Sequence, residues 1–289
     1  MSPRTLRVPA SSANLGPGFD ALAMALTLYL DFTFEADPRS VTQTDPPSDE
    51  GHLAVRTFRA EGGLGAVSVA ANFAGGRGLG FSGSARVAGC FAARLQHGDA
   101  WDVARSRALA RAADLEGHAD NVGASVVGGV VAVALPSNDN AEHESPVPLV
   151  VSVPNAIDAT VVVWIPQAET STKQSRTLLP IEVAFDDAVF NLGRASLLVA
   201  AFAAGDTSAL RAGTSDRLHQ HRRFERVPDS RAAYETMLDR DVLCAWLSGS
   251  GPTVAALCDR SVATSLSTVL PSSGRTVICD IDNQGTRYV

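Results

Sequence analysis

The feature that most constrains this chain is a glycine-rich segment, GGRGLGFSGSARVAG, at positions 75–89. Five of its first nine residues are glycines, and a small, apolar run without proline follows at 84–96 and predicts a buried helix. Such glycines let successive backbone N–H groups point toward one ligand, and the helix dipole behind them favours negative charge. The segment therefore predicts a phosphate-binding loop at a helix N-terminus.

The same glycines allow two other interpretations. Gly78, Gly80 and Gly83 satisfy the G-x-G-x-x-G fingerprint of dinucleotide-binding folds, but they lie 78 residues into the chain and follow no evident βαβ unit. The second interpretation is that the glycines form a tight structural turn before a helix and bind no ligand. The segment G-x-x-x-x-G-K-[ST] is absent from the sequence, so the loop is not of the Walker type.

Strand-like and helix-like patterns alternate irregularly along the chain. We expect strands at 28–35, 66–73 and 159–165, helices at 84–96, 104–115 and 186–204, a helix followed by a strand within 122–134, and a strand, glycine turn and strand at 243–257. At 289 residues the chain is long for one core. The polar segment 37–51 predicts a loop, and the segment 136–148 predicts a boundary between lobes. We therefore expect an α+β fold with lobes at 1–148 and 149–289, not a doubly wound α/β sheet.

Composition narrows the class of protein. Hydrophobic residues at 45% and charged residues at 19% are typical of an ordered globular protein, and a net charge of -7 disfavours nucleic-acid binding. The four cysteines form no C-x-x-C pair, which disfavours zinc and a disulfide framework. The N-terminus lacks the apolar core of a signal peptide, and no stretch approaches the ~20 apolar residues of a membrane helix. We expect a cytoplasmic protein without nucleic-acid or membrane partners.

Seven segments, spread over nearly the whole chain, match one family in its own order. The first is VPASSANLGPGFDALAMAL at 8–26, the second is the glycine loop, and LSGSGPTVAAL at 247–257 is the third of the main motifs. The other four are EGHADNVGASVVGG at 116–129, STKQSRTLLP at 171–180, VFNLGRASLLVAA at 189–201 and DRLHQHRR at 216–223. The chain resembles the GHMP kinase superfamily and, within it, the homoserine kinases. The resemblance implies an N-terminal lobe like ribosomal protein S5 domain 2 and a ferredoxin-like C-terminal lobe, with ATP and acceptor between them.

The resemblance also implies an activity: transfer of the γ-phosphate of ATP to the side-chain hydroxyl of L-homoserine, a step of threonine biosynthesis, with Mg²⁺. By the same resemblance, the nucleotide lies against the glycine loop and the helix start before it. The implied residues are His52, Leu53, Gly76, Gly78, Leu79, Gly80, Phe81, Ser82, Gly83 and Ser84. Ser82 and Glu116 correspond to the hydroxyl and carboxylate that hold magnesium, a hard cation that prefers oxygen ligands.

On the acceptor side, the resemblance implies a pocket for a zwitterion with a hydroxyl. Arg176 and Arg223 suit its carboxylate, and Asp20 suits its ammonium group. Neutral polar contacts are implied for Asn14, His118, Asn121 and Thr172. Asn121 and Arg176 are the implied catalytic positions. Mevalonate kinase relatives have a candidate aspartate base where this chain has Asn121, so no general base is assigned; a largely dissociative transition state needs little help from one.

The chain departs from the family pattern only on the nucleotide side. Phe81 replaces the first serine of the loop, Gly83 and Ser84 replace its two alanines, Ala74 replaces a proline, and His52 replaces the asparagine of an N-L pair. These departures leave two alternatives open, a kinase for a related hydroxy amino acid and a nucleotide-binding pseudokinase. A dinucleotide oxidoreductase is a third and weaker alternative. The oligomeric state stays open, with a homodimer as one possibility.

Overall fold

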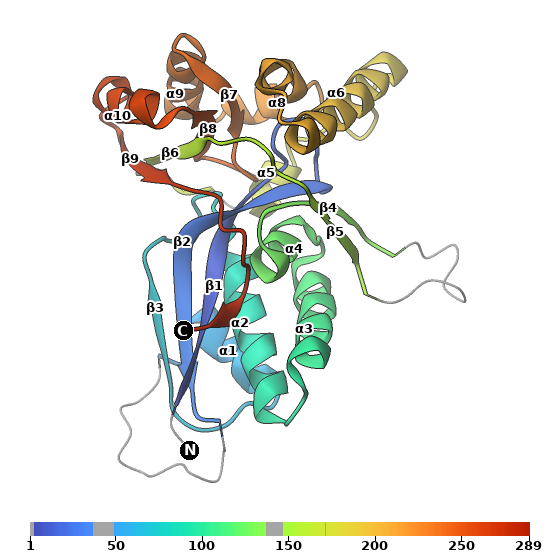
Figure 1. Ribbon diagram of the computed structural model, residues 1–289, viewed down its shortest axis with the longest axis vertical. Helices are drawn as coiled ribbons and strands as arrows, with labels where there is room; N and C mark the ends of the chain where they lie inside the picture. The colour runs from blue at the N-terminus through green and yellow to red at the C-terminus, as the bar shows by residue number, and fades with distance from the viewer. Residues whose placement is uncertain (1–2, 37–48, 137–146, 171) are drawn as a thin grey trace.

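The structure is a computed structural model that describes residues 3–36, 49–136, 147–170 and 172–289. Two antiparallel sheets lie in opposite halves of an elongated molecule, and helices accompany each of them (Figure 1). The α+β expectation is therefore confirmed. Most of the two polar segments, at 37–48 and 137–146, lies outside the described residues.

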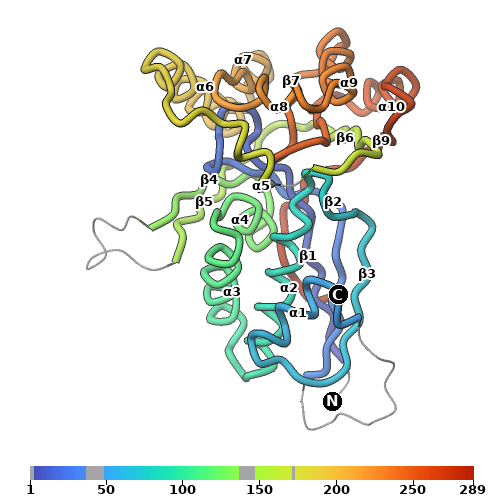
Figure 2. Tube along the Cα trace, turned by 180° about the vertical axis from the view of Figure 1, so that it is seen from behind, coloured from blue at the N-terminus to red at the C-terminus, as the bar shows by residue number. Residues whose placement is uncertain are grey.

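The first sheet contains six strands within the described residues. They are β1 (Arg4–Ala13), β2 (Leu22–Phe34), β3 (Val67–Ala71), β4 (Val130–Ala134), β5 (Leu149–Val153) and β10 (Arg287–Tyr288). Their order is β10-β1-β2-β4-β5, and β3 pairs with the other end of β2. One face carries α1 (Leu53–Ala60), α2 (Phe81–Gln96), α3 (Trp101–Glu116) and α4 (Asp120–Val127), of which α2 and α4 pack directly on β1 and β2 (Figure 2).

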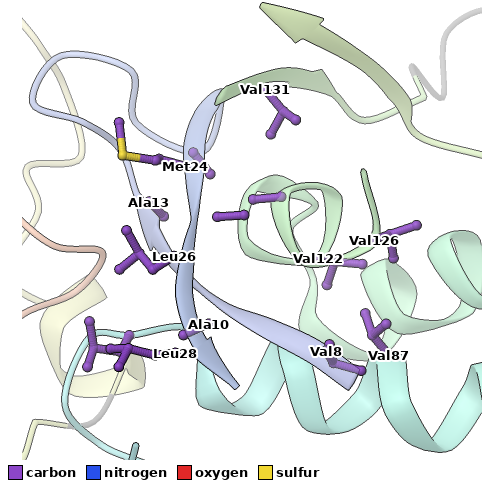
Figure 3. Packing of buried hydrophobic residues seen from close by; sticks show 14 of the residues in the cluster. Val8, Ala10, Ala13, Met24, Leu26, Leu28, Val87, Val122, Val126 and Val131 are labelled. Carbon is purple, nitrogen blue, oxygen red and sulfur yellow. The ribbon is translucent and has the colours of Figure 1, made fainter. Parts of the chain in front are cut away.

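The core of this half lies between the sheet and the helices. Figure 3 shows Val8 of β1 close to Val87 of α2, with Val122 and Val126 of α4 nearby. All four side chains are buried, and burying a side chain of this kind contributes about 1.5–3 kcal/mol. This packing fixes the N-terminal turns of α2 and α4 beside β1, and both turns carry expected site residues.

The second sheet contains four strands within the described part of the chain. They are β6 (Thr160–Pro166), β7 (Val242–Leu247), β8 (Val254–Cys258) and β9 (Gly274–Cys279), in the order β7-β8-β6-β9. The accompanying helices are α5 (Thr172–Arg176), α6 (Phe185–Ala204), η3 (Thr207–Ala209), α7 (Leu210–Gly213), α8 (Gln220–Phe224), α9 (Pro228–Leu238) and α10 (Arg260–Val269). Every residue of the central strand β6 is buried, as its run of β-branched residues predicts.

The expected elements are present with shifted ends. The helix expected from residue 84 begins at Phe81, and the strand expected from residue 28 begins at Leu22. The strand β1 was not predicted, because Pro9 interrupts it. The register shifts between Pro9 and Ala10, and such an irregularity accommodates a residue without a backbone N–H inside a strand. The four cysteines are buried free thiols.

The predicted lobe boundary at residue 148 does not separate the strands of the first sheet from those of the second. β5 follows that boundary but pairs with β4, and β10 at the end of the chain pairs with β1. The chain therefore crosses to the second sheet after β5 and returns to the first at its C-terminus. The division into 1–148 and 149–289 stays a prediction about lobes.

The helix α6 exposes several of its apolar side chains. Asn191, Leu198, Ala201 and Phe202 are buried on one face, whereas large apolar side chains such as Phe185 and Leu192 are exposed. By length and composition alone, α6 is also the one helix within the described residues that could span a membrane. The sequence analysis expected no segment with enough apolar residues for that.

Candidate active site

The glycine loop leads directly into α2 and can bind an anion through its backbone. Gly80 precedes the helix with a φ of 66°, and a Cβ atom there would lie 2.0 Å from Ser11 Oγ. A Cβ at Gly78, with a φ of 75°, would lie 2.4 Å from the carbonyl oxygen of Ser248. Only glycine fits at these two positions. The N–H groups in the first turn of α2 have no partner within the helix, so they suit a phosphate.

Hydrogen bonds join the loop to the first and third motifs. Ser11 N donates to Leu79 O at 3.1 Å. A directed chain runs from Trp246 Nε1 to Ser12 Oγ at 2.8 Å, from Ser12 to Ser248 at 2.7 Å, and from Ser248 Oγ to Gly78 O at 2.6 Å. The fold thus fixes the loop from both halves of the molecule.

Three expected loop residues do not present side chains to a ligand. Ser84, expected at the nucleotide, is buried, and its hydroxyl donates to Pro9 O at 2.9 Å, so its side chain does not reach the cleft. Leu79 is buried in the core, and Gly83 packs against Asn121. In this chain the small residues Gly83 and Ser84 serve packing, which the sequence pattern does not separate from binding.

Ser82 and Glu116 meet, as expected, between the starts of α2 and the end of α3. Ser82 Oγ donates to Glu116 Oε2 at 2.9 Å, and the carboxylate is only 7% exposed. Arg86 Nη1 lies 2.9 Å from Oε1 as an ion pair, but Oε1 has no hydrogen-bond partner of good geometry. A buried carboxylate beside a hydroxyl suits a cation, and in this structure Arg86 neutralises part of its charge.

No group of three or more His, Cys, Asp or Glu side chains that could hold a metal occurs within residues 3–36, 49–136, 147–170 and 172–289. Ser82 and Glu116 could therefore supply only part of a coordination shell, which phosphate oxygens and water would complete. Such a site suits a cation that arrives with a phosphate, because Mg²⁺ is commonly held by few protein ligands together with substrate phosphates.

Next to Glu116, the start of α4 brings together His118, Asp120 and Asn121. His118 Nδ1 is 2.8 Å from Asp120 Oδ1, and its Nε2 is 3.7 Å from Glu116 Oε2. Burial lowers the pKa of His118, but the hydrogen bond to Asp120 and the nearby carboxylates outweigh burial and raise it. Asn121 Oδ1 accepts from Ser11 Oγ at 2.8 Å. Asp120 was not expected in the site, although it stands inside the same sequence segment.

The acceptor side begins at the turn between β1 and β2. Asn14, Leu15 and Asp20 have positive φ angles of 71°, 45° and 56°. Non-glycine residues rarely adopt this conformation, and such strain concentrates at functional sites. Asn14 Oδ1 accepts from Asp20 N at 3.1 Å, and its amide nitrogen donates to Gly249 O at 2.9 Å. The turn thus holds the Asp20 carboxylate at a fixed place.

Arg176 and Asp20 are paired with each other. One terminal nitrogen of Arg176 lies 2.7 Å and 2.8 Å from the two Asp20 carboxylate oxygens. Sequence reasoning assigned the two residues to opposite charges of one ligand, and the structure places these charges side by side. Thr172 begins α5, but its side chain lies outside the description, so its expected contact stays a prediction.

Arg223 is buried in the same place and incompletely paired. Its Nη1 donates to Gly249 O at 2.9 Å and to His219 Nδ1 at 3.2 Å, whereas its Nε has no partner. Burial, together with the charge of Arg176, lowers the pKa of Arg223 to about 10. Both guanidinium groups lie 5.3 Å from the ring centroid of Phe19. Phe19 and His219 are site residues that sequence reasoning missed, although each stands inside a matching segment.

At the other end of the loop, Phe81 lies in an aromatic group. Its ring centroid is 5.6 Å from that of His52 and 5.7 Å from that of Phe73, both edge-on. His52 caps α1, because its Nδ1 accepts from Ala54 N at 3.1 Å, and burial lowers its pKa. Leu53, expected at the nucleotide, lines a neighbouring hollow with Arg56 and Arg86 instead.

One cleft contains most of the expected residues. Its walls include Asn14, Asp20, Gly76, Gly78, Gly80, Phe81, Ser82, Glu116, His118, Asn121, Arg176 and Arg223, together with Phe19, Asp120 and Gly249. The backbone donors of the loop and the charged acceptor set therefore face the same space. This arrangement can hold a polyanion against one wall and a small zwitterion against the other.

Comparisons with known proteins find relatives over most of the chain. A family model described as "GHMP kinases C terminal" matches residues 198–275. A homoserine kinase of Corynebacterium urealyticum is 37% identical over 281 residues, which are 90% of this chain and 88% of the relative. One of Thermus thermophilus is 37% identical over 292 residues, with 96% and 95% covered. A crystal structure of homoserine kinase from Cytophaga hutchinsonii has a TM-score of 0.81 at 22% identity and covers 100% of this chain and 98% of that one, so it shows the same fold.

Proposed function

Because this chain belongs to the homoserine kinase family of the ATP-using GHMP kinases, we propose that it transfers the γ-phosphate of ATP to the side-chain hydroxyl of L-homoserine. The observation that carries the proposal is the shared cleft, where a backbone anion site and an Asp–Arg–Arg set face one another. A phosphoryl transfer asks a protein mainly to position two reactants and to neutralise charge. The cleft is suited to both tasks.

The acceptor is held by its two charged groups. Its carboxylate would bind Arg223, whose Nε lacks a partner, and Arg176. Its ammonium group would bind Asp20. Arg176 and Asp20 pair with each other in this structure. The carboxylate and ammonium of the zwitterion would replace these partners, so that neither side chain is left without an opposite charge. This exchange makes the site selective for a molecule that carries both charges.

The nucleotide is held mainly by backbone. The N–H groups of Gly78, Gly80 and the first turn of α2 would bind the phosphates. Ser82 and Glu116 would hold Mg²⁺, which supplies charge neutralisation at the bridged phosphates when it is bound. The buried carboxylate beside the Ser82 hydroxyl fits such a cation.

The reacting hydroxyl would lie near His118 and Asn121, between the two walls. Asn121 cannot accept a proton at neutral pH, and its Oδ1 already accepts from Ser11. Asp120 Oδ1 is engaged by His118 and by the backbone N–H of Asn121 at 2.7 Å. We therefore assign no general base; these residues orient the hydroxyl, and its proton leaves late in the transfer.

A coupled ADP-release assay with L-homoserine, L-serine, L-threonine and mevalonate tests the proposal. We expect turnover with L-homoserine to exceed turnover with the other acceptors. Preference for another hydroxy amino acid would move the assignment to a related substrate. Absence of ADP release with every acceptor, together with absence of MgATP binding by calorimetry, would overturn the kinase function.

A further inference from the structure

His219 lies at the centre of the acceptor side, although it is fully buried and does not line the cleft. It stands just before α8, where Asp216 accepts from the backbone N–H of His219 at 2.9 Å and of Gln220 at 2.7 Å. These bonds fix the backbone at this point. The backbone of His219 is therefore fixed independently of the contacts that its ring nitrogens make.

Both ring nitrogens are used, and their partners define the tautomer. Nε2 lies 2.7 Å from the carbonyl oxygen of Gly16, which can only accept, so Nε2 carries the proton. Nδ1 then has a lone pair and accepts from Arg223 Nη1 at 3.2 Å. Burial lowers the pKa of His219 to about 4, which is consistent with a neutral ring beside a guanidinium group.

The ring connects the parts of the acceptor site that come from distant segments. Gly16 belongs to the turn that carries Asn14 and Asp20, and Arg223 comes from α8. The ring of Phe19, which lies beside the Arg223 guanidinium, is 5.2 Å from that of His219. With Gly249 O also on Nη1, one terminal nitrogen of Arg223 is fully engaged, and the Nε–H keeps no partner.

We propose that His219 is a positioning residue for acceptor recognition: it holds Nη1 of Arg223 so that the remaining N–H groups of this guanidinium bind the acceptor carboxylate. The inference rests on the proposed function and adds a residue that does not touch the substrate. Its bond to Gly16 sets the position of the Asn14–Asp20 turn, and its bond to Arg223 sets the guanidinium. The two bonds can be removed one at a time.

Two isosteric substitutions separate these bonds. In His219→Asn the amide oxygen can take the place of Nδ1, so the acceptor for Arg223 is kept and the bond to Gly16 is lost. In His219→Gln the amide nitrogen can take the place of Nε2, so the bond to Gly16 is kept and the acceptor for Arg223 is lost. His221→Gln is the matched control, since His221 is exposed two residues away.

The experiment compares L-homoserine with 3-aminopropan-1-ol, which has the hydroxyl and the amine but no carboxylate. We expect His219→Gln to lower the kcat/KM ratio of the two acceptors about tenfold, the effect of one lost hydrogen bond to a charged group. His219→Asn should lower it less, and the KM for ATP should not change in either variant. Equal ratios in both variants and the wild type would overturn the inference.

Two further observations keep the outcome decisive. If neither variant folds, the His219 ring can be followed by nitrogen NMR in the wild-type protein. L-homoserine should then shift the Nδ1 resonance and 3-aminopropan-1-ol should not; a resonance that both leave unchanged contradicts the inference. A wild-type protein without L-homoserine turnover would instead contradict the proposed function.

Discussion

The two walls of the cleft present charge by different means. On the acceptor side, side chains carry it: Asp20 and Arg176 are paired, Arg223 is buried, and the turn before Asp20 contains strained residues. On the nucleotide side, the backbone carries most of it, through the glycine loop and the first turn of α2. A side-chain site depends on residue identity, whereas a backbone site depends on where glycine is required.

This difference explains where the chain departs from its family pattern. Phe81 and Gly83 replace family residues at positions that offer backbone N–H groups, while Gly78 and Gly80, where a Cβ would collide, are kept. The acceptor side shows no such replacement among its expected residues. We infer that the two walls differ in their tolerance to substitution, and the following predictions test that difference.

The largest effect is expected for Arg223→Ala. The change removes a buried guanidinium and leaves the acceptor carboxylate without this donor, while Gly249 O keeps the bond from Asn14. The kcat/KM for L-homoserine should fall by two to three orders of magnitude, with little change in the KM for ATP. Arg222→Ala, at an exposed neighbour, is the control. Arg176→Ala should cost less, because its side chain is 38% exposed. Wild-type homoserine kinetics in Arg223→Ala would contradict the side-chain assignment.

Glu116→Gln should give the next largest effect, because it is a side-chain requirement on the nucleotide wall. The amide keeps the shape but loses the charge beside Ser82, so kcat at limiting magnesium should fall about a hundredfold and recover in part at high magnesium. Calorimetry should show a weaker magnesium dependence of nucleotide binding. Asp114→Asn, an exposed carboxylate near the end of the same helix, is the control. Full activity of Glu116→Gln at limiting magnesium would exclude it from the metal site.

The sequence predicts the nucleotide wall from local residue types, whereas it predicts the acceptor wall only through the family resemblance. A glycine cluster before an apolar run predicts an anion-binding turn without reference to a family, because glycine readily adopts the positive φ angles that such a turn needs. The acceptor residues Asp20, Arg176 and Arg223 lie far apart in the chain, and only the family resemblance brought them together. The fold class followed from the irregular order of strands and helices.

What the sequence could not predict depends on long-range packing. The buried hydroxyl of Ser84 resembles that of Ser82 in the sequence, yet one faces Pro9 O and the other faces Glu116. Helical periodicity separates the two faces only when the start of the helix is known, and we placed that start three residues late. The ion pair of Arg176 with Asp20 and the role of His219 depend on contacts across more than a hundred residues.

The acceptor wall should also show a pH dependence of stability through His219. His219, ordinarily near pKa 6.5, has a folded pKa of about 4, so the unfolded chain takes up a proton first as pH falls. Stability should therefore be complete above pH 6.5 and decrease until pH 4, by up to about 3 kcal/mol at 1.36 kcal/mol per pKa unit.

Other groups around His219 must be separated from this effect. Arg223 stays charged in this range. Burial raises the pKa of Asp216, but the attraction to His219 once that ring is protonated, and the hydrogen bonds that Asp216 accepts, outweigh burial and lower it. The stability that depends on ionised Asp216 is therefore lost at lower pH. Urea unfolding of the wild type and of His219→Gln at pH 7 and pH 4 isolates the ring. Parallel pH profiles would show that His219 is not held neutral, and His221→Gln should follow the wild type.

The smallest effect is expected for Phe81→Ser, which restores the family residue. The Phe81 ring packs edge-on against Phe73 and His52, while only the backbone N–H of this position is needed at the phosphates. The change should lower stability by about 1–2 kcal/mol and alter the KM for ATP only a few-fold, and the KM for L-homoserine should stay constant. Kinetics with both substrates and thermal unfolding test this. The opposite result, a wild type that binds no MgATP by calorimetry and a Phe81→Ser variant that does, would mean that the ring fills the phosphate site. The backbone wall would then be as sensitive to its side chains as the acceptor wall.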